Sequence, residues 1–126
     1  MAHPNADLFR KGFEAGMAGD MATMGEMFAD DAKLHWPGGD FEGKEAILAM
    51  WAEPMPEGMT WQSELHAVLA DDEHTVALIK NTVVRNDETI HNDVVQVFHI
   101  SDDKVAEAWM VPVDHAAFEA IWASWT

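Results

Sequence analysis

The first half of the chain carries apolar residues at the spacing of α-helices. One such stripe predicts a first helix, capped by Asn5 and ending at Met17, and it consists of Ala6, Phe9, Phe13 and Met17. The pair Gly19-Asp20 ends this helix and caps a second one, whose buried residues are Met24, Met27 and Phe28. The chain therefore opens with two consecutive amphipathic helices.

A short strand and a third helix follow. The strand is predicted over Ala32–Trp36 and ends at the turn formed by Pro37, Gly38 and Gly39. The third helix is predicted over Lys44–Trp51, and its apolar face consists of Ile47, Leu48 and Trp51.

From Met59 onward the apolar period changes from helical spacing to strict alternation. The first long strand presents one face of Met59, Trp61, Ser63, Leu65, Ala67 and Leu69. Three further strands are predicted over His74–Arg85, Thr89–Ile100 and Val105–Val113, joined by the turns RNDET and SDDK. Asp114 then caps a last short helix, whose apolar face consists of Phe118, Ile121, Trp122 and Trp125.

This order of elements predicts one α+β domain over residues 1–126. Three N-terminal helices would pack on a curved antiparallel sheet, with a short helix at the C-terminal end. Helices cover the concave face of such a sheet only in part, so we expect a ligand cavity between them.

Composition and charge exclude several classes of protein and of binding partner. Hydrophobic residues make up 48% of the chain, which excludes disorder, and cysteine is absent, which excludes disulfides and thiolate chemistry. The formal net charge is −16 with seven Lys and Arg, so nucleic acid is not an expected partner. No apolar run reaches membrane-spanning length, and MAHPNADLFRKG lacks the apolar segment of a secretory signal. We expect a cytoplasmic protein that binds no membrane.

Two segments resemble a known superfamily. The stretch AGDMATMGEMFADDAKLHWPGGDFEGKEAI is similar to the opening of NTF2-like proteins, particularly ketosteroid isomerases and SnoaL-like polyketide cyclases. The later stretch VVQVFHISDDKVAEAWMVPVD resembles the hairpin that closes a SnoaL-like domain. The resemblance implies the NTF2-like, or cystatin-like, cone and a small-molecule pocket, with isomerase-like or cyclase-like chemistry as one possible activity.

The acids that the resemblance implies are replaced in this chain. Trp36 occupies the position of the isomerase base and Gln96 that of the oxyanion acid, while the position of the isomerase tyrosine falls on or beside Gly12. Met110 stands where cyclases and related epoxide hydrolases carry an acid, and a thioether has no proton to give. A standard ketosteroid isomerase is therefore not expected.

Strand alternation predicts which side chains share the pocket. They are Trp36, Trp51, Trp61, Asn81, Val83, Asn92, Gln96, Phe98 and Met110. Such walls suit an apolar or aromatic molecule that a few amides orient, and Asn81 and Gln96 either contact it or bond to each other. One alternative is a pocket that binds its ligand without catalysis, which the missing carboxylates favour. The other is an ordinary core, in which case the domain serves dimerisation rather than ligand binding.

His35 is the candidate for any remaining acid–base catalysis, because it adjoins Trp36 at the end of the short strand. The alternative, favoured by alternation, places its side chain on the opposite face. His91 and Asp93 have the i, i+2 spacing of a chelating pair, but no third ligand is evident, so no metal site is expected. No cofactor is expected either.

The outward face of the predicted sheet is unusually apolar, with Val84, Val95, Val97, Trp109 and Val111. A row of this kind should not face water. The resemblance implies a homodimer through this face, and the pattern supports it. The alternative is that the C-terminal helix covers the row.

Overall fold

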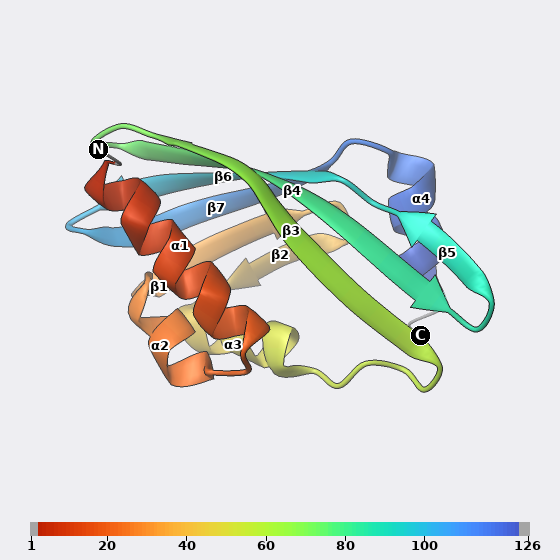
Figure 1. Cartoon of the computed structure of the whole chain (residues 1–126). Helices are drawn as coiled ribbons and strands as arrows, with labels where there is room; N and C mark the ends of the chain where they lie inside the picture. Colours follow the sequence, from red (N-terminus) through yellow and green to blue (C-terminus); the bar gives the residue numbers. More distant parts are fainter. Residues whose placement is uncertain (1–2, 124–126) are drawn as a thin grey trace.

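The computed structural model describes residues 3–123 and contains four helices there (Figure 1). They are α1 (Pro4–Met17), α2 (Met21–Glu26), α3 (Lys44–Ala52) and α4 (His115–Ala123). All four predicted helices are confirmed within a few residues. The predicted contribution of Trp125 lies outside the described residues, and that of Trp122 outside the described side chains.

The described strands form one seven-stranded sheet in the order β2-β1-β7-β6-β4-β3, with β5 paired to β4. Their bounds are β1 (Phe28–Trp36), β2 (Gly39–Glu42), β3 (Met59–Ala70), β4 (His74–Arg85), β5 (Glu88–His91), β6 (Val94–Ser101) and β7 (Lys104–Pro112). The α+β class is confirmed, but the sheet is mixed rather than fully antiparallel, because β1 runs parallel to β7.

That parallel pairing also moves the start of the first strand. The Val105 N–H donates to the Met27 carbonyl at 2.8 Å, and Phe28 stands opposite Val105. Pairing to β7 therefore converts Phe28, predicted as helical, into the first residue of β1. The four-residue β2, which sequence pattern did not predict, forms a hairpin with β1 through the pair Trp36 and Gly39.

Side-chain caps hold the N-termini of α1 and α2, with one difference from prediction. Asp20 Oδ1 accepts a hydrogen bond from the Thr23 N–H at 3.1 Å, as expected for an N-cap. The cap of α1 is His3, whose Nδ1 accepts from the Asn5 N–H, rather than Asn5 itself. The Asn5 amide instead donates to the Asp71 carbonyl at 2.9 Å and ties α1 to the turn before β4.

Two side chains that the sequence pattern placed on buried faces are exposed in the structure. The register of β3 shifts between Leu65 and Ala67, so the inward face changes parity and Leu69 is left 62% exposed. Trp51 is 39% exposed near the end of α3.

The strand predicted over Thr89–Ile100 is divided into β5 and β6 by Asn92 and Asp93. Its alignment with β4 nevertheless continues across the break, because Thr82 pairs with His91 and Ile79 pairs with Val94. The Asn92 N–H donates to the Asn81 carbonyl at 2.9 Å within the same alignment. Asn92 therefore stays directly opposite Asn81.

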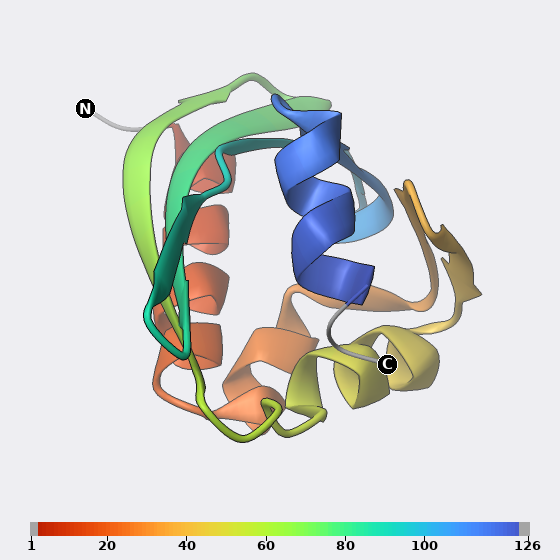
Figure 2. The same cartoon turned by 90° about the vertical axis from the view of Figure 1, so that its right-hand side faces the viewer.

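The sheet bends around the helices, which lie on its concave side (Figure 2). The main apolar cluster joins α1, α2 and α3 to the sheet and includes Phe9, Ile47, Ile79, Phe98 and Ala108. A smaller cluster of Met59, Val83 and Ile121 seats α4 at the other end. None of the helices within residues 3–123 has the length and apolar character needed to cross a bilayer.

Candidate functional site

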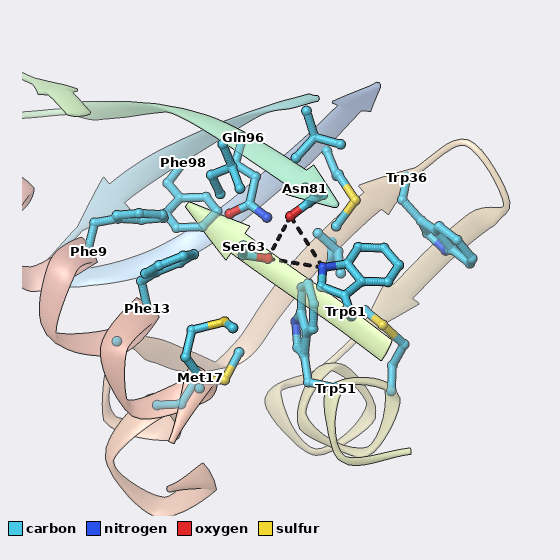
Figure 3. Close-up of a pocket in the computed structure, with 18 of the residues that line it drawn as sticks. Phe9, Phe13, Met17, Trp36, Trp51, Trp61, Ser63, Asn81, Gln96 and Phe98 are labelled. Carbon is cyan, nitrogen blue, oxygen red and sulfur yellow. Dashed lines mark hydrogen bonds between the residues drawn. The ribbon is translucent and has the colours of Figure 1, made fainter. Parts of the chain in front are cut away.

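A cavity of about 350 Å³ lies between the helices and the concave face of the sheet (Figure 3). This volume is at the lower end of the range for small-molecule sites. Its walls are mainly aromatic rings and thioethers, including Phe9, Phe13, Trp36, Trp51, Trp61, Phe98, Met17, Met21, Met24, Met27, Met50, Met55 and Met110. Methionine side chains are flexible and polarisable, so these walls can adapt to the shape of an apolar ligand.

Eight of the nine residues predicted for the pocket line this cavity: Trp36, Trp51, Trp61, Asn81, Asn92, Gln96, Phe98 and Met110. The exception is Val83, which is fully buried against Met59 and Ile121. Val83 lies two residues beyond Asn81 along β4, where α4 covers the concave face.

Sequence reasoning missed several wall residues. Phe9 and Phe13 were predicted as the buried face of α1, yet they also border open volume, as do the methionines of α1 and α2. Helical periodicity identifies a buried face but cannot distinguish packed core from a cavity wall. Ser63 was also missed, although its alternation with Trp61 had already placed it on the inward face of β3.

Three polar side chains form a hydrogen-bonded cluster on the sheet (Figure 3). The Trp61 Nε1–H donates to Ser63 Oγ at 3.0 Å and to Asn81 Oδ1 at 3.2 Å. The Ser63 hydroxyl donates to Asn81 Oδ1 at 2.6 Å. Because an indole N–H only donates, these contacts identify the Asn81 atom that faces Trp61 as the amide oxygen.

The register of the sheet does not bring Asn81 and Gln96 together, so the two side chains do not form the hydrogen bond considered for them. Gln96 stands opposite Ala77, four residues from Asn81 along β4. Asn81 is bonded to Ser63 and Trp61 instead, and the Gln96 side chain points into the cavity (Figure 3).

Asn92 is the outlier among the polar wall residues. It is 0% exposed, and neither its Oδ1 nor its Nδ2 has a hydrogen-bond partner among the described residues. An unsatisfied buried amide of this kind costs about 1–3 kcal/mol. Among the described residues, the wall of this apolar cavity therefore holds a donor and an acceptor without partners.

The cavity carries little charge. Among the described lining residues the only titratable side chain is Glu53, an exposed residue that follows α3. General acid–base catalysis needs a group that exchanges a proton with the bound molecule. Glu53 is thus the one residue of the described lining that could do so.

His35 lies on the other side of the sheet. Leu34 and Trp36 line the cavity, so alternation along β1 turns His35 outward. There its Nδ1 lies 2.9 Å from Asp40 Oδ1, its Nε2 lies 2.5 Å from Glu107 Oε2, and its ring stacks on Trp109. The hydrogen bond to Asp40, followed by that to Glu107, raises the pKa of His35 above its ordinary value.

The proposed catalytic role of His35 in this cavity therefore has no geometric basis. Its neighbours favour a protonated imidazole held between two carboxylates at the sheet surface. Within the part of the chain that the structure describes, no group of three or more His, Cys, Asp or Glu residues is arranged to hold a metal ion. His91 and Asp93, whose spacing is that of a chelating pair, are both exposed.

Comparisons with known proteins identify the family and the fold of this chain. The profile of the SnoaL-like domain matches residues 9–108. No curated protein matches the chain. Among solved structures, Bal32a from a soil-derived mobile gene cassette is 28% identical, with a TM-score of 0.84 over 94% of this chain and 96% of that one.

Two more distant structures share the fold. An LEH-like epoxide hydrolase from M. tuberculosis is 13% identical, with a TM-score of 0.75 over 95% of this chain and 90% of that one. An NTF2-like protein of unknown function from Cytophaga hutchinsonii is 14% identical, with a TM-score of 0.68 over 91% and 95% of the two chains. The chain therefore has the NTF2-like fold and belongs to the SnoaL-like domain family.

Proposed function

We propose that the cavity binds a small, uncharged and mainly apolar molecule. The observation that supports this most directly is the wall itself, which combines aromatic rings and methionines with three amides and one carboxylate at the rim. Burial of apolar surface would supply the affinity, and the amides would orient the ligand.

Electrostatics disfavours an anionic ligand. No Lys or Arg is among the described lining residues, so a buried anion would have no ion-pair partner. The net charge of −16 would also repel an anion as it approaches. We therefore expect the cavity to discriminate against carboxylates and phosphates of the same shape.

A thermal-shift panel of small aromatic compounds, terpenoids, steroids and polyketides tests this proposal. A ligand that binds only the folded state, at a free concentration of about a hundred times its Kd, stabilises that state by about 2.7 kcal/mol. We expect uncharged members to raise the melting temperature and to quench the fluorescence of the cavity tryptophans. Ionised analogues should do neither.

Two neighbouring positions on β6 supply matched variants for this panel. Gln96→Phe places a ring inside the cavity and should abolish the shift. Val95→Phe adds the same ring on the outer face and should leave the shift unchanged. Equal loss in both variants, or a panel in which no uncharged compound binds, would contradict the proposal.

Binding without turnover is the function that this wall supports best. Isomerase-like or cyclase-like chemistry needs proton transfer, and Glu53 is the only described lining group that could perform it. A compound that stabilises the protein should be recovered unchanged after prolonged incubation. Conversion that disappears in Glu53→Gln would instead identify an enzyme.

We also propose that the chain forms a homodimer through the outer sheet face. Val95 stands opposite Val111, and Val97 stands opposite Trp109, so the apolar row crosses β6 and β7 without interruption. The alternative cover is not supported, because Phe118 lines the cavity and Ile121 packs on Met59 and Val83, both on the concave side. Val111 remains 48% exposed.

Light scattering coupled to size-exclusion chromatography tests the dimer. We expect twice the chain mass at micromolar concentration, and a monomer for Val111→Glu, because the charge would be buried at the contact. Val113→Glu is the matched control, since Val113 lies past the end of β7 and is 69% exposed. A wild-type monomer at these concentrations would rule out this dimer.

A further inference from the structure

We infer that Asn81 and Asn92 together form a two-point hydrogen-bonding site for an amide, so that the ligand is an uncharged carboxamide or lactam on an apolar body. This inference rests on the proposed function, because it concerns the polar end of a ligand held in the same cavity. It adds the chemical class that the cavity selects.

The polar residues form a row across three neighbouring segments of the sheet. Ser63 on β3 pairs with Asn81 on β4, and Asn81 stands opposite Asn92 between β5 and β6. Side chains directly opposite one another on a sheet point to the same face and lie close together. All three residues line the cavity, so the row runs along its wall.

The donors and acceptors of this row are unevenly used. Asn81 Oδ1 already accepts from the Trp61 indole and the Ser63 hydroxyl, which fills both of its lone pairs. What Asn81 can offer a ligand is therefore its Nδ2 donor. Asn92 can offer both a donor and an acceptor, because neither of its polar atoms is bonded within the described chain.

A carboxamide or lactam is the group that matches this set. Its carbonyl oxygen would accept from the Nδ2 groups of Asn81 and Asn92, and its N–H would donate to Asn92 Oδ1. A ketone would leave Asn92 Oδ1 unsatisfied, because it has no donor. A carboxylate would place a negative oxygen against Oδ1 and would lose its hydration without gaining a cation.

Burial of Asn92 sets a condition on this contact. The side chain is 0% exposed, so its amide lies beneath the surface of the wall rather than in open volume. A ligand reaches it only if neighbouring side chains move aside. The cavity-lining methionines have several rotatable bonds and can rearrange at low cost, which makes such movement compatible with the fold.

Four naphthalene derivatives of similar shape test the inference by calorimetric titration of the full chain. They are naphthalene, 2-acetylnaphthalene, 2-naphthamide and 2-naphthoate. We expect 2-naphthamide to bind roughly 5- to 100-fold more tightly than 2-acetylnaphthalene, because only the amide satisfies both atoms of Asn92. In Asn92→Leu this ratio should fall to about one, while naphthalene binding persists, because only the hydrogen bonds are removed.

The outcomes separate the inference from the function on which it rests. If naphthalene binds but the amide shows no advantage over the ketone, the amide site is refuted and the apolar cavity stands. If the advantage survives in Asn92→Leu, the site is refuted as well. If none of the four binds, the proposed function fails, and the inference falls with it. Circular dichroism of Asn92→Leu establishes that a lost ratio does not reflect unfolding.

Discussion

Replacing Asn92 with leucine is expected to raise the free energy of unfolding of the ligand-free chain by about 1–3 kcal/mol. The wild-type amide is 0% exposed, and neither its Oδ1 nor its Nδ2 has a partner in the described chain. Leucine has nearly the same shape and needs no hydrogen bond, so the penalty of the buried amide disappears. For a chain of this length, each kcal/mol corresponds to a shift of roughly 4 °C in melting temperature.

Urea unfolding with linear extrapolation measures this change, and an unchanged slope establishes that the variant unfolds from the same fold. The same variant should lose its preference for amide ligands, so stability and recognition move in opposite directions at one position. A destabilised Asn92→Leu would mean that the amide is satisfied in solution, and it would remove the basis for a free donor and acceptor.

A leucine at Asn81, which stands opposite Asn92, should change the free energy of unfolding in the opposite direction. Asn81→Leu is expected to lower the free energy of unfolding by about 1–3 kcal/mol, because it removes the acceptor shared by Trp61 and Ser63. The Ser63 hydroxyl, 2.6 Å from Asn81 Oδ1 in the wild type, would lose the acceptor it has there. Both asparagines are buried and face the same cavity, so they differ mainly in their partners.

Thermal unfolding of the two leucine variants side by side gives the direct comparison. A double variant separates local effects from coupling, since residues in contact deviate from additivity. If Asn81→Leu were as stable as Asn92→Leu, the hydrogen bonds among Trp61, Ser63 and Asn81 would contribute nothing to folding. The cluster would then be a weak surface feature of the cavity rather than a support for its wall.

The polar groups of the cavity wall favour ligand recognition over catalysis. The carboxylates that the family resemblance implies are replaced by Trp36, Gln96 and Met110, and all three replacements line the cavity. At these three positions the wall thus presents one amide and two largely apolar side chains where the resemblance implies acids. A neutral donor and acceptor can orient a ligand but cannot exchange a proton with it at ordinary pH.

Local pattern predicted most of the elements because it depends on neighbours in sequence. The period of α1, the alternation of β4 and the caps at Asp20 and Asp114 each involve residues a few positions apart. Alternation also placed Asn81, Asn92 and Gln96 on one inward face. It gave His35 the outward orientation that the structure has, against the catalytic role considered for it.

Features that depend on distant pairing could not be predicted in this way. The conversion of Phe28 from helix to strand follows from its pairing with Val105, far along the chain. The shift between Leu65 and Ala67 reverses the face of β3 without any mark in its alternation. The partner of Asn81 was likewise decided by register, because register places Ser63 beside it and moves Gln96 away.

The sequence by itself determined the α+β class, the order of the helices and long strands, the apolar and acidic composition, and the inward-facing side chains of β4, β6 and β7. Each of these depends on residue type and on a period of two or 3.6 residues, which short stretches of chain express by themselves. Only the tertiary structure decided that the inward faces enclose a cavity, that Val83 lies beneath α4, and that Asn92 is buried with no hydrogen-bond partner among the described residues. Those outcomes depend on how curved sheet and helices meet, and no local period specifies the space left between them.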